Sequence, residues 1–166
     1  MNNKKLKLKI VTPERLILEE LVDQVTLPTT QGEITVLPNH IPLIASLASG
    51  DVVATVGGEQ VPMAVVGGFI EVKSRRPKGS GIHDLRLQSG SGQDYITEVA
   101  ILADFAEHVG ELSDERIKEA KRRAEEIRKK IENKEIVDFE HFEAELERSL
   151  TRVKIADKWR TKKYRK

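Results

Sequence analysis

The spacing of hydrophobic residues changes about two thirds of the way along the chain. Up to about Asp104, short segments rich in Val and Ile are separated by Gly and Pro, and LKLKIV (residues 6–11) alternates apolar residues with lysines. Such alternation buries one face of a strand and leaves the other in water. Many short strands at close spacing predict a β-sandwich or barrel. The strands are expected at residues 6–11, 15–20, 22–29, 33–38, 51–58, 60–68, 69–73 and 99–104, with a hairpin turn at Gly57-Gly58.

Residues 74–98 fit neither a strand nor a helix. They are rich in Gly and Ser and have almost no apolar pattern. Loops this long in compact domains are usually functional or disordered. We expect a mobile insertion inside a hairpin formed by residues 67–73 and 99–104.

From about Ser113 the apolar residues recur every three or four positions, as on one face of a helix. Ser113 is placed to cap the first helix, with Leu112 and Ile117 as a hydrophobic staple, and Asp138 to cap the second, with Val137 and Phe142. The short segment ENKEIV between the helices predicts an antiparallel hairpin. The expected apolar stripes are Ile117, Ala120, Ala124, Ile127 and Ile131 on the first helix, and Phe139, Phe142, Leu146, Leu150 and Val153 on the second.

Composition narrows the class of protein. The chain has 166 residues, 39% hydrophobic and 33% charged, with no cysteine, which excludes a disulfide framework and a thiolate zinc site. No apolar run approaches the ~20 residues of a membrane span, and the N-terminus is not typical of a secretory signal, so we expect a soluble intracellular protein. Residues 148–166 hold nine Lys or Arg and one acid, whereas the rest of the chain sums to −7. This basic end suggests an acidic partner, a nucleic acid or a membrane face.

Known catalytic patterns are absent from the sequence. The four histidines form no zinc-protease pair, no Ser lies in a nucleophile elbow, and no Walker-type phosphate loop occurs. His40 lies in GEITVLPNHIPL, where Pro38 fixes the chain, Asn39 favours a turn and Pro42 keeps Ile41 extended. A stiff polar turn presenting Glu33, Asn39 and His40 is interpreted as a docking surface rather than a catalytic site.

The order of several segments resembles the epsilon subunit of bacterial F-type ATP synthases. They are VTPERLI, VDQVTLPTTQGEITVLPNHIPL, GGFIEV and ILAD with AEH, followed by a charged helix hairpin. The resemblance covers nearly the whole chain except residues 74–98. It implies an α+β protein, with a flattened β-sandwich of about ten strands at residues 1–108 and an antiparallel α-helical hairpin at residues 109–166.

The resemblance also implies a function. Members of this family are not enzymes by themselves. They lie in the central stalk, bind the gamma subunit and the ring of c subunits, couple ion-driven rotation to ATP synthesis, and can inhibit ATP hydrolysis. Such a protein is peripheral, at the cytoplasmic face of the bacterial plasma membrane. The residues expected to face gamma and the c-ring are Glu33, Pro38, Asn39 and His40.

The helical hairpin resembles the regulatory element of the family, in which basic residues meet an acidic segment of the beta subunits. The corresponding cations are Arg148, Arg152, Lys154, Lys158 and Arg160, followed by Lys162 and Lys163. Some members bind ATP through an I/L-D-x-x-R-A motif. Leu112 and Arg116 match it, and Arg123, Arg148 and Arg152 add positive charge, but Ser113 replaces the Asp and Ile117 replaces the Ala. These two departures argue against ATP binding, and no other cofactor is expected.

Two alternatives remain from the residues alone. The tail KWRTKKYRK interleaves Trp159 and Tyr164 with cations, as in a nucleic-acid-binding module. An unrecognised enzyme using His40 and Glu33 is the other. The nucleic-acid-binding alternative gives the β half no role, and the enzyme alternative gives the helical hairpin none.

Overall fold

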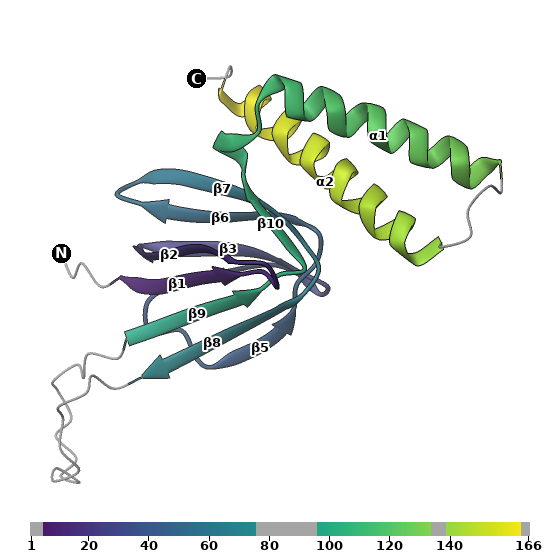
Figure 1. Cartoon of the computed structure of the whole chain (residues 1–166). Coiled ribbons are helices and arrows are strands. Elements are labelled where there is room, and N and C mark those ends of the chain that lie inside the picture. The colour runs from purple at the N-terminus through teal and green to yellow at the C-terminus, as the bar shows by residue number, and fades with distance from the viewer. Residues whose placement is uncertain (1–4, 76–95, 134–138, 164–166) are drawn as a thin grey trace, which may run out of the picture.

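A computed structural model describes residues 5–75, 96–133 and 139–163 (Figure 1). In these residues ten strands precede a helical hairpin, which confirms the predicted order of β then α. The elements are β1 (Leu6–Val11), β2 (Leu16–Val22), β3 (Gln24–Thr29), β4 (Gly32–Val36), β5 (Leu43–Ser46), β6 (Gly50–Val56), β7 (Glu59–Val66), β8 (Phe69–Arg75), β9 (Ile96–Leu102), β10 (Phe105–His108), a 3₁₀ turn (Val109–Glu111), α1 (Asp114–Glu132) and α2 (Phe139–Lys163).

The strands form a sandwich of two five-stranded sheets. The first sheet has the order β2-β1-β9-β8-β5 and the second β10-β7-β6-β3-β4. Only β1 and β9 pair in parallel; the other pairs in these sheets are antiparallel. The predicted turn between β6 and β7 is confirmed, because Gly57 and Gly58 have φ of 59° and 86°, which glycine adopts without steric cost.

Two of the crossings between the sheets, from β7 to β8 and from β9 to β10, lie next to each other. At the first crossing Gly68 has φ 112°, and a Cβ there would lie 2.0 Å from the carbonyl oxygen of Leu102. Only glycine fits this approach of two backbones. The pair Gly67-Gly68 therefore lets the two crossings lie against each other.

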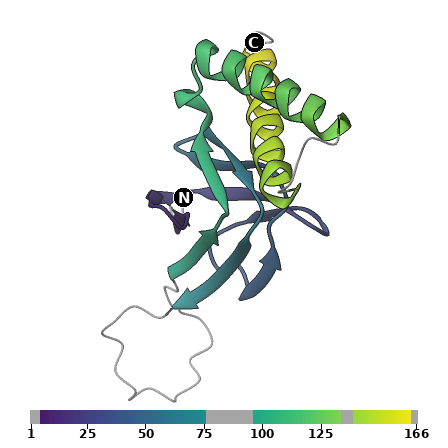
Figure 2. The ribbon, with the colours of Figure 1, turned by 45° about the vertical axis from the view of Figure 1, so that its right-hand side comes forward.

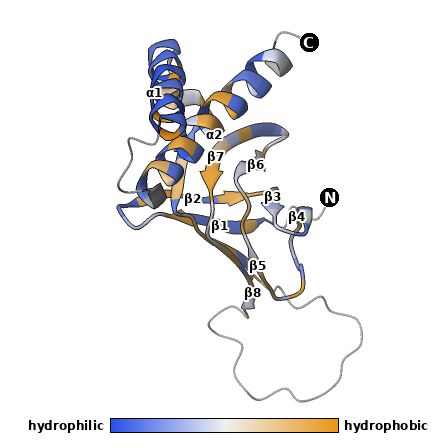
Figure 3. Ribbon diagram, turned by 90° about the vertical axis from the view of Figure 1, so that its right-hand side faces the viewer, coloured by the Kyte–Doolittle hydropathy of each residue, from blue (hydrophilic) through white to orange (hydrophobic). Residues whose placement is uncertain are grey.

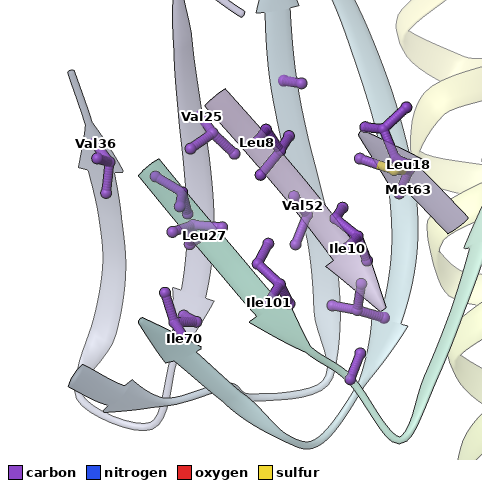
Figure 4. Close-up of a cluster of buried hydrophobic side chains, with 14 of the residues drawn as sticks. Leu8, Ile10, Leu18, Val25, Leu27, Val36, Val52, Met63, Ile70 and Ile101 are labelled. Carbon is purple, nitrogen blue, oxygen red and sulfur yellow. The ribbon is translucent and has the colours of Figure 1, made fainter. Parts of the chain in front are cut away.

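The core lies between the two sheets (Figure 4). Inward residues such as Leu8, Ile10, Val25, Met63 and Ile101 have no exposed surface. They come from alternate positions of their strands, as the period of two predicts. β5 and β10 were missed by the sequence reading. Each has only four residues, too short for alternation to be visible.

The helices lie against one end of the second sheet (Figures 1 and 2). The cap and staple of α1 are confirmed: Ser113 Oγ accepts a hydrogen bond from the backbone N–H of Arg116 at 3.3 Å, and Leu112 and Ile117 are buried together with Ala156. The predicted cap at Asp138 lies outside the described residues. So does most of the insertion, although β8 and β9 flank it as an antiparallel pair, as expected. Within the described residues, neither helix is long and apolar enough to cross a membrane.

The buried face of α2 differs from the predicted stripe. Leu150 is 52% exposed, whereas Ser149, Thr151, Ile155 and Ala156 are buried. Figure 3 shows α1 largely hydrophilic and α2 with hydrophilic and hydrophobic positions interspersed. The prediction for Leu150 was wrong because α2 packs against both α1 and the sheet, and small Ser and Thr side chains permit that close approach.

Candidate functional site

The predicted turn at His40 is present at the end of β4. The backbone N–H of His40 donates to the carbonyl of Leu37 at 3.1 Å, with Pro38 and Asn39 at the two central positions. Asn39 has φ 68°. This is the arrangement of a type II turn, in which Pro favours the first central position and Asn or Gly the second.

Long-range hydrogen bonds fix this turn in place. The backbone N–H of Asn39 donates to Thr97 Oγ1 at 2.6 Å, and Ser74 Oγ donates to the carbonyl of His40 at 3.1 Å. Ser74 and Thr97 lie at the ends of β8 and β9 that are farthest from the helices (Figure 2). The turn is therefore a rigid surface at the end of the molecule opposite the hairpin.

The side chain of His40 contacts the backbone next to it. His40 Nδ1 lies 2.7 Å from the neighbouring carbonyl of Ile41. In the described ranges no three His, Cys, Asp or Glu side chains gather to hold a metal ion. The expectation that Glu33 shares this turn was wrong. Glu33 pairs with Pro28 at the start of β4, and four residues of strand, roughly 13 Å, separate it from Leu37.

An apolar row crosses the outer face of the first sheet. The register pairs Leu16 with Val11, Val11 with Leu102, and Leu102 with Phe69, so these side chains stand side by side on one face. Leu16, Leu102 and Phe69 are 50%, 56% and 62% exposed, and Ile44 on the adjoining strand is 74% exposed. The next rows carry charges, including the ion pair of Lys7 with Glu19. Exposed apolar patches with a polar rim are common at protein interaction sites.

A cavity of 380 Å³ lies between the sandwich and the helices, and its lining is rich in arginine. Glu107 from β10 meets both helices there: its Oε1 lies 2.9 Å from Arg116 Nη1 and its Oε2 lies 2.8 Å from Arg152 Nε. The guanidinium of Arg152 also lies over the ring of Phe105, 4.5 Å from its centroid. Arg123 pairs with Glu145 at 2.5 Å. The cavity brings together Arg15, Arg116, Arg123, Arg148 and Arg152.

Comparison with known proteins identifies the family. Residues 5–76 match the family described as "ATP synthase, Delta/Epsilon chain, beta-sandwich domain". An ATP synthase epsilon chain of Syntrophobacter fumaroxidans is 36% identical over 93% of this chain and 97% of its own length. One of Dehalococcoides mccartyi is 36% identical over 94% of this chain and 95% of its own. The chain belongs to the ATP synthase epsilon chain family.

The fold is also found in a solved assembly. A chain in the cryo-EM structure of the Euglena gracilis mitochondrial ATP synthase, containing OSCP, F1 and the c-ring, superposes with a TM-score of 0.55. The two chains are 21% identical, and the match covers 95% of this chain and 80% of that one. This likeness supports the sandwich-plus-hairpin fold expected for an epsilon chain. The relatives give no support to the nucleic-acid-binding alternative.

Most of the cations expected to inhibit ATP hydrolysis in an epsilon chain form ion pairs within this chain. Arg152 binds Glu107, Lys158 binds Asp51, and Arg160 binds Asp114. Arg148 lines the cavity with its guanidinium 6.0 Å from the centroid of Phe105, and Lys154 is exposed. In this folded arrangement Arg152 and Lys158 are therefore part of the contact between α2 and the sandwich, and Arg160 joins α2 to α1.

The residues considered for ATP binding divide into two groups. Arg116, Arg123, Arg148 and Arg152 line the one cavity, whereas Leu112 packs in the apolar cluster with Ile117 and Ala156. The sequence reading identified the arginines but missed their carboxylate partners, Glu107 and Glu145. Glu107 lies in a strand too short to show a pattern, so its orientation toward the helices had no local signal.

Proposed function

We propose that this chain is a non-catalytic subunit of the central stalk of an F-type ATP synthase. In this proposal the sandwich docks on the gamma subunit and the c-ring, and so couples ion-driven rotation to ATP synthesis. The helical hairpin restrains ATP hydrolysis by meeting the beta and alpha subunits. The complex holds the chain peripherally, at the cytoplasmic face of the bacterial plasma membrane.

The apolar row on the outer face of the first sheet is the observation that carries this proposal. Leu16, Leu102 and Phe69 are each at least half exposed. Burial of these side chains against a partner would remove apolar surface from water. The helices pack on the second sheet and leave this face open. The row therefore suits a partner that stays bound whether the hairpin is folded or extended, and gamma is that partner in our proposal.

The position of the turn supports a second contact. It lies at the opposite end from the helices, fixed to Ser74 and Thr97. We assign Pro38, Asn39 and His40 to the c-ring contact, and Glu33, at the far end of β4, to the neighbouring surface. A stiff turn is suited to transmit torque, because each fixed dihedral reduces the slack between the two bodies. The hairpin then faces the catalytic head.

Substitution of Phe69 tests the docking surface. Phe69→Asp puts a charge in the centre of the row and should weaken binding to gamma by about thirtyfold or more, as for loss of an aromatic anchor. Lys73→Gln is the matched control, because it lies on the same face of β8 and also changes the net charge by −1. Binding is measured by isothermal titration with purified gamma. Equal affinities for Phe69→Asp and the wild type would exclude the row as the docking surface.

Removal of the hairpin tests the restraint of hydrolysis. ATP hydrolysis by the alpha-beta-gamma complex is measured with the full-length chain and with a chain ending at His108. We expect the full-length chain to slow hydrolysis and the shortened one to bind without slowing it. If both bind and neither inhibits, the chain only couples and assembles the complex. If neither binds, the stalk assignment fails.

We propose further that the hairpin packs against the sandwich without bound ATP. The two departures from the nucleotide motif support this, and so do the ion pairs of Arg116, Arg152 and Arg123 with Glu107 and Glu145. A triphosphate would have to displace both carboxylates. The melting temperature of the chain should therefore be unchanged by millimolar ATP, since a ligand that does not bind the folded state adds no stability. A rise that increases with ATP concentration would contradict this.

A further inference from the structure

A row of three residues on the outer face of the second sheet lies directly beneath α2. Glu107 on β10 and Asp51 on β6 both pair with Ala64, on the strand β7 between them. Residues directly opposite each other in antiparallel strands point to the same face of a sheet. The three side chains therefore form one line across the strands, with a carboxylate at each end and a small residue in the middle. We call this line the α2 seat.

The Glu107 end of the seat binds both helices. Its side chain is only 10% exposed, and its two oxygens accept from different arginines, Arg116 of α1 and Arg152 of α2. Charge-assisted hydrogen bonds of this kind are stronger than neutral ones and set orientation as well as attraction. One carboxylate of the sandwich thus joins α1 to α2 and both to β10.

The Asp51 end of the seat binds the last turns of α2. Its side chain is 11% exposed. Lys158 Nζ lies 2.8 Å from each of its oxygens, and the indole Nε1 of Trp159 donates to Oδ2 at 3.0 Å. Two consecutive residues of α2 therefore converge on one nearly buried carboxylate.

The dimensions of the seat and the helix agree. Two strand spacings separate Glu107 from Asp51, about 10 Å. Lys158 follows Arg152 by six positions of helix, a rise of about 9 Å at 1.5 Å per residue. Between these cations, Ile155 and Ala156 are 2% and 1% exposed. Ala64 has no exposed surface, and its small side chain lets the helix lie close to the sheet.

We infer that Glu107, Ala64 and Asp51 hold α2 in the folded position and that the two carboxylates set how readily the hairpin inhibits. The inference rests on the proposed function, because Arg152 and Lys158 are also cations that we assign to the contact with the beta subunits. Each cation serves either the seat or the partner, not both at once. Release of α2 breaks the ion pairs of both carboxylates with these cations. Asp51 and Glu107 are thus positioning residues, which act on hydrolysis through the helix they retain.

Amide hydrogen exchange of the full-length chain tests the seat directly. Glu107→Gln and Asp51→Asn keep the shape of each side chain and remove its charge. Loss of a hydrogen bond to a charged group corresponds to a shift of roughly tenfold or more between folded and released helix. The amides of α2 should therefore exchange about tenfold faster in each variant. Glu126→Gln is the matched control, because in the described part of the chain Glu126 pairs along α1 with Arg122.

Inhibition of the alpha-beta-gamma complex is measured with the same variants. Both seat variants should inhibit hydrolysis at a lower concentration than the wild type, and Glu126→Gln should not. Unchanged exchange in Glu107→Gln and Asp51→Asn would overturn the seat. Faster exchange with unchanged or weaker inhibition, from a wild type that does inhibit, would overturn the competition for Arg152 and Lys158. If exchange rises but no chain inhibits, wild type included, the seat stands and the proposed restraint of hydrolysis fails.

Discussion

The core of the sandwich draws its buried residues from both sheets, whereas the apolar cluster at the start of the hairpin consists of Leu112, Ile117 and Ala156, with Val153 against it. The sandwich is held together by backbone hydrogen bonds between strands and by buried apolar side chains. The hairpin adds ion pairs at its margins, including those of Glu107 and Asp51. Contacts in the buried core are lost only when the whole sandwich unfolds. Ion pairs of the hairpin can instead be replaced one at a time by ion pairs with a partner. The difference suits a fixed scaffold that carries a detachable element.

The largest effect is expected at the crossing of the two sheets. Gly68→Ala places a Cβ 2.0 Å from the carbonyl oxygen of Leu102 and should destabilise the sandwich by about 4 kcal/mol or more, or prevent folding. Gly58→Ala is the control, since its φ is also positive but a Cβ there meets nothing within 4 Å; about 1 kcal/mol is expected. Urea unfolding measures both. Equal costs would show that close approach does not decide the role of Gly68.

Truncation of one isoleucine in each region compares the two kinds of packing. Ile101→Ala, at 0% exposure in the sandwich core, should cost about 2–5 kcal/mol of global stability. Ile117→Ala, at 4% exposure under the hairpin, should instead increase amide exchange in α1 and α2 and leave exchange in the sandwich unchanged. If Ile117→Ala lowers protection equally in both regions, the hairpin does not open independently.

A smaller effect is expected at the start of α1. Ser113→Ala removes the acceptor of the Arg116 N–H and should lower the stability of the hairpin by about 1 kcal/mol. Circular dichroism at the helix band, followed on heating, measures this loss. Ser113→Asp restores an acceptor and should recover the helix; failure of Asp to do so would indicate that the cap contributes little.

The smallest effect concerns pH and lies on the sandwich surface. A hydrogen bond from Lys7, together with its charge, lowers the pKa of Glu19. The folded state therefore binds the proton less tightly than the unfolded chain. The contribution of Glu19 is present above its unfolded pKa and is lost as the pH falls through the lowered folded pKa. Lys7→Gln should flatten this acid dependence in urea titrations, and Lys9→Gln should flatten it less. The reverse order would contradict the assignment to Lys7.

Local sequence patterns were sufficient for most elements and for some details of their ends. Alternation gave the inward face of β1. Residues that tolerate positive φ marked the turns at Gly57-Gly58 and Asn39, and Ser113 marked the start of α1. These features depend on residues within a few positions of one another, so a single sequence contains all the information needed. β5 and β10 were missed because each has only four residues, too few for alternation to be visible.

The surfaces that matter for function were decided by tertiary structure. The apolar row joins β2, β1, β9 and β8, and the α2 seat joins β10, β7 and β6. Alternation tells which side of its strand a residue faces, but the neighbour across the sheet depends on register between segments far apart in the chain. The sequence by itself determined the sandwich, the hairpin and the stiff turn. Only the packed structure decided that Glu107 and Asp51 flank Ala64 under α2, and that Ser149 and Thr151, rather than Leu150, face inward.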